Sequence, residues 1–514
     1  MHRTLRPLKD CYIVDRVIKS TRKWNANTGK AGSLDIFKLY GATLSGTVSN
    51  NELSRLLVKF DLTDLSDDFA AGKIDINSPS FNVSLKLFDV YGGQPNPTNF
   101  TLKLYPLSQS FDEGGGKDVV LFRDSDIANF LTASYVSGVQ NIWHASGANA
   151  KGLLGSSDID IIASGNLNDG LGIQNLWITQ SFTAGTENLV MDVTKIVSAT
   201  LKSLMPDCGF RISFVESDEN DTETRFVKRF GSLEASDPYV RPQLVVKFDD
   251  SVISHESNFT FDTSNTLFLY NYVKGNLQNV VSGTSLTQIT GSNSLLLKLV
   301  TRHSASTGFE DFISYVTASQ HRIGSTNVTG IYSASFTLTS ATPKFQTKLR
   351  QSGSVIFDQI WGSFDGTVSY YTGSLVGNPP GSSTGPTNPK RYYVNVTNIS
   401  NEYSLSDTAR MKVFFFDYSS PVVKLVRTPV ETPSVIIENA HYSIRDAITD
   451  AVIIPFDQTY NSTRMSADSQ TMYFDVIMSS LFPGRSYVID ILVREGGQEQ
   501  IYRDASPAFR VVEM

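Results

Sequence analysis

The chain has 514 residues, of which 40% are hydrophobic and 18% charged, so it has enough apolar surface to fold and is long for a single core. At about 100 to 200 residues per domain, this length predicts roughly three compact domains. The 44 basic and 51 acidic residues give a formal net charge of -7, with no long run of either sign. Binding nucleic acid through its phosphates needs a basic face or arm, so nucleic acid is not an expected ligand.

The N-terminal segment contains basic residues but no apolar run of the length that a signal peptide needs, and no later stretch approaches about eighteen apolar residues. We therefore expect a protein that is made and kept in the cytoplasm, with no membrane span. Cys11 and Cys208 are the only cysteines, too few for a disulfide scaffold or a four-ligand zinc site. Both fall in the first predicted domain and could meet there, but two separate reduced core thiols are expected.

Alternation of apolar and polar residues dominates the first half of the chain. Leu56, Val58 and Phe60 share one face of a predicted strand, while Leu57 and Lys59 share the other, which is typical of a half-buried strand. The same pattern recurs in the segments 81–87, 100–104, 210–214 and 243–248. Clusters of Gly, Ser, Asn, Asp and Pro separate these segments. Helical turns are expected only at 125–131 and at 193–204, the latter after the cap Asp192.

Two shifts in composition divide the chain. After the strand at 242–250 the sequence becomes rich in Ser, Thr and Asn with many Phe and Tyr, and Pro421, Pro429 and Pro433 bracket a second extended segment. These shifts predict domains at 1–250, 251–425 and 426–514. Many short strands with such turns indicate an all-β fold of tandem β-sandwiches.

The first domain resembles the DNRLRE-type β-sandwich, a jelly-roll-like module of secreted or surface-associated proteins. The matching segments, in the family's order, are Lys9–Val14, Asn27–Gly29, Arg55–Leu62, Arg229–Ala235 and Arg241–Phe248. The sequence departs from the family at Leu233, where the family's Ser-Arg-Glu stretch has its arginine. The segment from Asp112 to Phe182 looks expanded. The resemblance implies a fold more than a function.

The last domain resembles immunoglobulin-like and fibronectin-type sandwiches in its stretch Leu481–Tyr487. In those folds a tyrosine corner places a tyrosine hydroxyl on the backbone of the preceding corner, and Tyr487 is the expected tyrosine. Roughly the last 90 residues are also similar to structural proteins of the neck, tail or baseplate of tailed bacteriophages.

A loop in the middle domain is the main candidate interaction element. The segment 377–389 is rich in Gly and Pro and can form neither helix nor strand ladder, so we expect an exposed hairpin loop between strands at 369–372 and 391–396. Adjacent tyrosines on a strand place one ring inward and one outward. The candidate contact residues are Tyr370, Tyr371, Asn378, Pro379, Pro380, Tyr392 and Tyr393.

Known catalytic patterns are not recognisable. The six histidines are dispersed, and the single Gly-x-Ser-x-Gly match, Gly381–Gly385, lies in the Pro-rich loop instead of on a strand-to-helix turn. Two acidic clusters could supply a glycosidase carboxylate pair or calcium ligands, although we expect solvated loops. They are Asp158, Asp160 and Asp169, and Glu216, Asp218, Glu219 and Asp221. We therefore predict no catalytic residue, cofactor or metal.

Together, sandwiches of extracellular style, few cysteines and no export signal favour a virion protein that is assembled in the host cytoplasm. We expect a structural component of a tailed phage neck, tail or baseplate that contacts other virion proteins and forms a homo-oligomer, with no membrane or nucleic-acid partner. The alternative is a phage or cell-surface protein that binds or cleaves glycans, with the first domain as its sugar platform.

Overall fold

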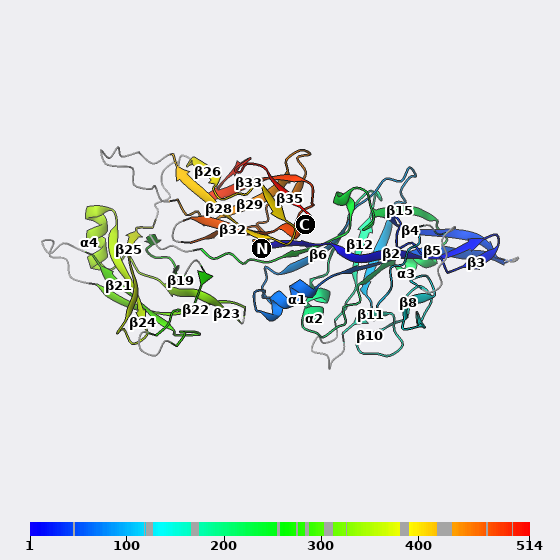
Figure 1. Ribbon diagram of the computed structural model, residues 1–514, viewed down its shortest axis with the longest axis horizontal. Coiled ribbons are helices and arrows are strands. Elements are labelled where there is room, and N and C mark those ends of the chain that lie inside the picture. The colour runs from blue at the N-terminus through cyan, green and yellow to red at the C-terminus, as the bar shows by residue number, and fades with distance from the viewer. Residues whose placement is uncertain are drawn as a thin grey trace. The chain divides into compact units, whose positions relative to one another are not determined.

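The computed structural model describes residues 1–513 with the exception of 45–46, 118, 120–126, 166–173, 254–257, 274–275, 283–286, 303–311, 325, 381–389, 419–433, 469–470 and 496. The chain folds as two compact units. One is His2–Ala70 with Phe81–Lys247, and the other is Met1, Ala71–Ser80 and Phe248–Met514. Strands dominate both units (Figure 1), so the predicted all-β fold of tandem β-sandwiches is confirmed.

The first unit is the N-terminal sandwich, built from two sheets. The strands of the smaller sheet, in order, are β1 (His2–Leu5), β16 (Gln243–Lys247), β6 (Asn82–Leu87) and β13 (Leu189–Asp192). Those of the larger sheet are β12 (Ile178–Phe182), β7 (Phe100–Pro106), β14 (Phe210–Phe214), β5 (Thr47–Phe60), β2 (Pro7–Ile18) and β3 (Thr21–Lys23), with β4 (Ser33–Leu44) joining β5 to β15 (Arg225–Gly231). Neighbours in these two sheets run antiparallel, and β1 pairs with β16, so the first and last strands of this unit are neighbours.

Strand β5 is buried on both faces, which the alternating pattern did not predict. Leu56 and Val58 are fully buried on one face, but Leu57 on the other face is fully buried as well. Leu57 joins Cys11 and Ile13 in a second core cluster that includes Phe111, Phe130 and Trp143. The expanded segment therefore covers the outer face of the larger sheet, and the expectation of a half-buried strand is wrong here.

This covering segment carries short strands of its own. They are β8 (Thr132–Val136), β9 (Val139–Ile142), β10 (Lys151–Leu153) and β11 (Ile161–Ser164). Cys11 and Cys208 are both free and buried in the second core cluster. Burial of the Cys11 thiol raises its pKa, so this thiol stays protonated and unreactive.

Helices are few. The predicted helix at 193–204 is confirmed as α2 (Thr194–Leu201), whose first amide donates to the Asp192 carboxylate at 2.9 Å. The predicted turn at 125–131 is wrong for its described part, because residues 127–131 form bends. The remaining helices are α1 (Thr63–Ala70), α3 (Glu216–Asn220) and α4 (Pro343–Ser352), with 3₁₀ turns η1 (Pro238–Val240) and η2 (Met478–Ser480).

The second unit contains two separate hydrophobic cores. The middle domain is one curled seven-stranded sheet with α4 beside β24 (Figure 1). Its strands, in order, are β17 (Asn258–Thr260), β25 (Ser369–Asn378), β24 (Val355–Ser363), β21 (Leu295–Thr301), β22 (Ile313–Ile323), β23 (Thr326–Phe336) and β18 (Asn265–Tyr270). A small ribbon adds β19 (Tyr272–Val273) and β20 (Asn276–Leu277). Because β17 and β18 are consecutive in the chain yet lie at opposite ends of the sheet, the sheet closes around its core.

The C-terminal sandwich has two sheets. One orders β26 (Tyr392–Val396), β28 (Thr408–Asp417), β32 (Met472–Ile477) and β31 (Ser466–Ala467). The other orders β27 (Glu402–Ser404), β35 (Phe509–Val512), β33 (Ser486–Glu495), β29 (Ala440–Asp446) and β30 (Val452–Ile454), with β34 (Gln498–Tyr502) on β33. The predicted tyrosine corner is confirmed. The buried Tyr487 hydroxyl donates to the Phe482 carbonyl and accepts from the Phe482 amide, both at 2.8 Å.

The predicted boundary at 425/426 differs from the structure. Strand β28 pairs with β26 on one side and with β32 on the other, so residues from Tyr392 onward belong to the C-terminal sandwich. The predicted hairpin is also wrong, because β25 pairs with β24 and β26 pairs with β28. The segment 377–389 therefore connects two domains. Its residues 381–389, and the proline-bracketed stretch 421–433, lie outside the described residues.

Candidate interaction surfaces

The candidate contact residues of the middle domain lie at the two ends of β25: Tyr370 and Tyr371 are near its start, whereas Asn378 is its last residue and Pro379 and Pro380 follow it. Tyr370 is half-buried against the middle core, whereas Tyr371 is exposed. The Asn378 carbonyl accepts the Phe261 amide at 2.9 Å, and Pro379 and Pro380 are exposed. Of these residues, only Tyr371 and the two prolines offer open surface.

Tyr392 and Tyr393 lie in the C-terminal sandwich, apart from Tyr371. Tyr392 is buried in the core and its hydroxyl donates to Glu495, while Tyr393 is 47% exposed, so the prediction of one ring in and one ring out is confirmed. Tyr393 lies edge-on to Tyr418 at 6.4 Å between ring centroids, and Tyr418 lies edge-on to Phe416 at 5.4 Å. We call Tyr393, Phe416 and Tyr418 the aromatic corner.

Strand β26 is at the edge of its sheet, but its outer side is occupied. The Tyr392 amide donates to the Tyr502 hydroxyl at 3.1 Å, and the Val396 amide donates to the Ala505 carbonyl at 2.8 Å. A partner strand needs such amides for edge pairing. The aromatic corner can therefore offer side chains to a partner but not this edge.

The hairpin β8–β9 exposes the densest group of large apolar side chains in the described chain. It turns through Ser137 and Gly138, both with positive φ, as a two-residue turn of the I′ type requires. Val136, Val139 and Ile142 are 56%, 62% and 62% exposed, and Tyr135 and Leu131 are exposed beside them. Opposite residues of paired strands share a face, so the register Tyr135↔Gln140 and Val136↔Val139 puts apolar side chains on both faces.

The first acidic cluster is structural. Asp160 is fully buried, and its carboxylate accepts the amides of His144, Ala145 and Ala150 at 2.8 to 2.9 Å. Asp158 is exposed to solvent, and Asp169 lies outside the described residues. The expectation of a solvated loop holds for Asp158 but is wrong for Asp160, whose carboxylate anchors three loop amides.

The second acidic cluster is neutralised by cations. Glu219 is buried and accepts two hydrogen bonds from the Arg55 guanidinium, at 3.0 and 2.7 Å. Asp221 pairs with Arg225 and with Lys38, and these bonds hold the pKa of its carboxyl well below the usual range. Asp218 accepts the Thr101 amide at 2.9 Å. Each of these carboxylates is committed to a structural partner, so the expected solvated loop is wrong here as well.

A basic and aromatic group surrounds Tyr105 on the outer face of the larger sheet. The Lys103 ammonium lies 4.2 Å from the Trp177 ring centre and 4.9 Å from that of Tyr105, and Lys151 lies 5.8 Å from Tyr105. The Arg211 guanidinium lies 5.7 Å from the Tyr105 ring centre. Glu216 contacts Lys103 at 3.5 Å, also pairs with Lys151, and accepts from the Tyr105 hydroxyl at 3.3 Å. We call Lys103, Tyr105, Lys151, Trp177 and Arg211 the basic–aromatic patch.

Three of the segments that carry the DNRLRE resemblance, those of Asp10, Asn27 and Leu233, meet in one polar network. Asn27 donates to the carbonyls of Glu113 and Ala128 at 2.8 and 2.7 Å, and accepts the Gly116 amide at 2.8 Å. Asp10 accepts the Leu233 amide at 2.7 Å. Burial raises the pKa of Asp10 to about 7, although the bond from Leu233 opposes this rise. The motif residues thus tie distant loops together, which is a structural role.

Lys30 closes this network at the surface. Its ammonium contacts Glu113 at 3.0 Å and Glu234 at 2.6 Å. These hydrogen bonds raise the pKa of Lys30 to about 12. Glu234 is the acidic residue that follows Leu233, so the ion pair stands beside the point where the sequence departs from the family.

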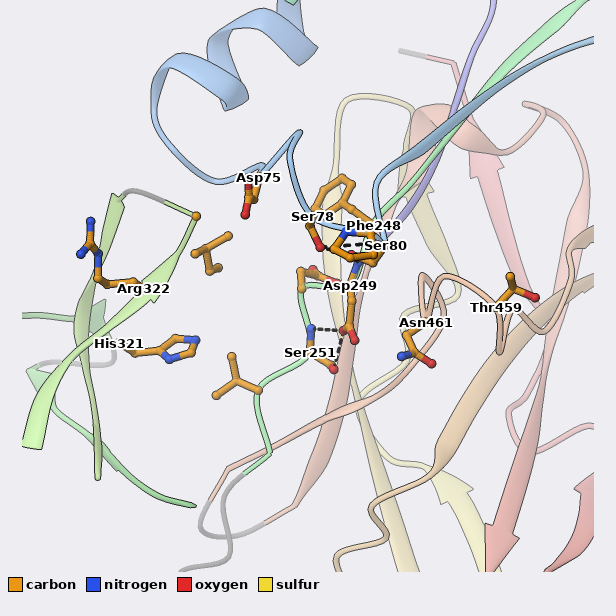
Figure 2. Close-up of a pocket in the computed structure, with 15 residues that line it drawn as sticks. Asp75, Ser78, Ser80, Phe248, Asp249, Ser251, His321, Arg322, Thr459 and Asn461 are labelled. Atoms are coloured by element: carbon orange, nitrogen blue, oxygen red, sulfur yellow. Dashed lines mark hydrogen bonds between the residues drawn. The ribbon is translucent and has the colours of Figure 1, made fainter. Parts of the chain in front are cut away.

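A pocket of about 510 Å³ lies in the second unit, and Figure 2 shows its lining. Its carboxylates are held by local donors. Asp249 accepts the amide and the hydroxyl of Ser251 at 2.9 and 2.6 Å, Asp75 accepts the Asn77 amide at 3.0 Å, and Asp250 pairs with the Met1 ammonium. His321 also lines the pocket, and burial lowers its pKa. The bonds to Asp75 and Asp249 stabilise the turns in which these residues lie.

Within the described ranges, no group of three or more His, Cys, Asp or Glu side chains could hold a metal ion. Among the same residues, no helix has the length and apolarity needed to cross a membrane.

No family model matches the sequence, and no curated protein is significantly similar to it. Solved structures similar to part of the chain include the fibronectin(III)-like modules of CbhA from Clostridium thermocellum, at 8% identity over 52% of this chain and 93% of that chain, with a TM-score of 0.14. The Ig1-2 module of the Drosophila receptor protein tyrosine phosphatase DLAR is 6% identical over 51% of this chain and 95% of that chain, also with a TM-score of 0.14. A chimeric titin Z1Z2 is 6% identical over 51% and 94%, with a TM-score of 0.16. At such TM-scores these similarities carry no argument about this chain.

Proposed function

We propose that the chain is a structural component of a tailed phage particle, assembled in the host cytoplasm, that joins neighbouring subunits without bond chemistry. The observation that carries the proposal is the hairpin β8–β9. Its Val136, Val139 and Ile142 side chains are each more than half exposed, and contiguous exposed apolar side chains mark protein–protein contact sites in soluble proteins.

The position of the hairpin supports an assembly role. It belongs to the expanded segment between β7 and β12, beyond the strands that the DNRLRE resemblance covers. The base of this segment is anchored, since Trp143 is buried and its indole donates to the Asn129 carbonyl at 2.9 Å. A two-stranded ribbon alone is marginally stable in water. An anchored base with apolar side chains on both faces of its tip suits insertion between partner surfaces.

The partners of the acidic side chains also support a role without catalysis. Asp160 and Glu219 are buried in hydrogen bonds or ion pairs, and Asp221 is paired with two cations. A glycosidase needs one carboxylic acid free to give up a proton and a second carboxylate across the bond. These three carboxylates are already committed to partners of the fold.

The proposal is tested by comparing Val139→Ser with Val190→Ser. Both residues are exposed valines of the N-terminal sandwich, at 62% and 52%, but Val190 lies on β13, away from the hairpin. Particles are assembled with each variant, and the copy number of the chain per particle is measured by mass spectrometry. We expect Val139→Ser to lower incorporation and Val190→Ser to leave it unchanged. Equal incorporation of both variants would contradict a role for the hairpin.

A further inference from the structure

The basic–aromatic patch carries a local excess of positive charge in a chain of net charge -7. Around Tyr105, the cations Lys103, Lys151 and Arg211 lie close to the carboxylates of Glu216 and Glu219, and Glu219 also pairs with Arg55. The Arg55 guanidinium donates two hydrogen bonds to the Glu219 carboxylate, so these two charges neutralise each other. Glu216 contacts both Lys103 and Lys151, whereas Arg211 interacts with Glu219 and Glu216 only at longer range.

Arg211 is the least compensated of these cations. It is 2% exposed, and its one described hydrogen bond runs to the neutral amide oxygen of Asn149 at 3.1 Å. Its Nε is buried with no acceptor among the described residues. Burial, and then the neighbouring Arg55, lower the pKa of Arg211 to about 9. A buried guanidinium without a carboxylate of its own favours an anion close by.

The patch is open at Trp177, Lys151 and Glu216, while the Lys103 side chain is 14% exposed. Trp177 is 36% exposed, and the side chains of Lys151 and Glu216 are 38% and 46% exposed. Trp, Tyr and Arg are the residues that dominate binding energy at protein interfaces. A sugar would stack on a face of the indole ring, and the Lys103 ammonium occupies one of the two faces at 4.2 Å from the ring centre. Composition and geometry together favour a protein ligand over a glycan.

We propose that the basic–aromatic patch docks an acidic segment of a partner protein, whose carboxylates bind Lys103 and Lys151 where Glu216 binds them now. This inference rests on the proposed assembly function and names the chemistry of one partner. Glu216 occupies the site in the free chain and competes with the incoming carboxylates. Charge complementarity of this kind gives an interface its specificity and a salt-dependent association.

The test measures the binding of a fluorescently labelled polyglutamate peptide to the full chain by anisotropy. We expect salt-sensitive binding that the double substitution Lys103→Gln with Lys151→Gln weakens about tenfold. The matched control is Lys195→Gln, because Lys195 is an exposed lysine of the same sandwich on α2, outside the patch; this variant should bind like the unmodified chain. Melting curves of all variants report whether each one folds.

The substitution Glu216→Gln should change the affinity for the peptide in the opposite direction. It removes the competing carboxylate and should tighten binding about threefold. A merely structural role for Glu216 would give no such gain. Equal binding by the unmodified chain, the double variant and the control overturns the inference. Binding of a polygalacturonate oligomer without binding of the peptide also overturns it, in favour of an acidic glycan. These outcomes are independent of whether the chain is found in particles, so the inference can fail while the proposed function stands.

Discussion

The N-terminal sandwich and the middle domain bury very different side chains. The sandwich places Asp10, Lys38, Arg55, Arg211 and Lys228 in its interior at 5% exposure or less. Among the described residues of the middle domain no charged side chain is buried, and its core is built around rings such as Phe259, Phe261 and Phe357. Ion pairs specify geometry but depend on pH, whereas ring packing does not. The two regions should therefore respond to different perturbations.

The largest effect is expected from Phe357→Ala in the middle domain. Phe357 is fully buried and contacts the rings of Phe259 and Phe345 at 5.4 and 5.7 Å between centroids. Removing such a ring leaves a cavity and costs about 3 to 5 kcal/mol of unfolding free energy. Hydrogen exchange followed by mass spectrometry should show faster exchange in peptides of β21 and β24, with the same change at pH 5 and pH 8. A change that differs between the two pH values would contradict the claim that ring packing in the middle domain does not depend on pH.

Asp10→Asn should change the pH dependence of the N-terminal sandwich. The pKa of Asp10 rises from 3.8 to about 7 on folding, so the folded state holds this proton more tightly than the unfolded state. The stability from this group is complete below pH 3.8 and is lost as the pH rises through 7, at most about 4 kcal/mol in total. Asparagine keeps an acceptor for the Leu233 amide but cannot ionise.

The measurement is the protection of β2 peptides against hydrogen exchange between pH 5 and pH 8, corrected for intrinsic exchange rates. The unmodified chain should lose protection as the pH rises, and Asp10→Asn should lose less. Asp158→Asn, at an exposed carboxylate, is the control and should follow the unmodified chain. Identical pH profiles for all three proteins would show that Asp10 does not set this dependence.

A smaller effect is expected from Tyr487→Phe in the C-terminal sandwich. The substitution removes the hydroxyl that bonds both the carbonyl and the amide of Phe482, and leaves these buried groups without that partner. The cost is about 1 to 3 kcal/mol. Tyr393→Phe changes an exposed ring and should alter stability by less than about 0.5 kcal/mol. Thermal melting of the two variants measures their losses of stability. Equal losses would contradict the assignment of Tyr487 to a structural tyrosine corner.

Features that depend on interactions between residues close in sequence were predictable. The tyrosine corner was predictable because all its atoms lie within Phe482–Tyr487. Helix α2 was predictable because the carboxylate of Asp192, just before it, accepts the Thr194 amide, although the cap position is Val193 and not the predicted Asp192. Helix α4 was missed although the sequence carries Pro343 at its first turn and Gly353, with φ of 72°, at its end. These two residues are typical helix boundaries.

Long-range packing accounts for the errors. Nothing near Leu57 reveals that Phe111 and Trp143 cover it, and local sequence cannot show that β26 pairs with β28 instead of β25. The basic–aromatic patch was missed for the same reason, because Lys103, Trp177 and Arg211 come from three separate strands or loops. The acidic residue Glu216 was singled out, but without the cations that explain it.

The central claim is that the chain is a building element of a phage particle. It is tested most directly by mass spectrometry of purified intact particles from the host lysate that contains this protein. The account predicts the chain among the particle proteins, at a copy number fixed by the symmetry of a neck, tail or baseplate. Its absence from intact particles, with the monomeric chain free in the lysate, would contradict the account.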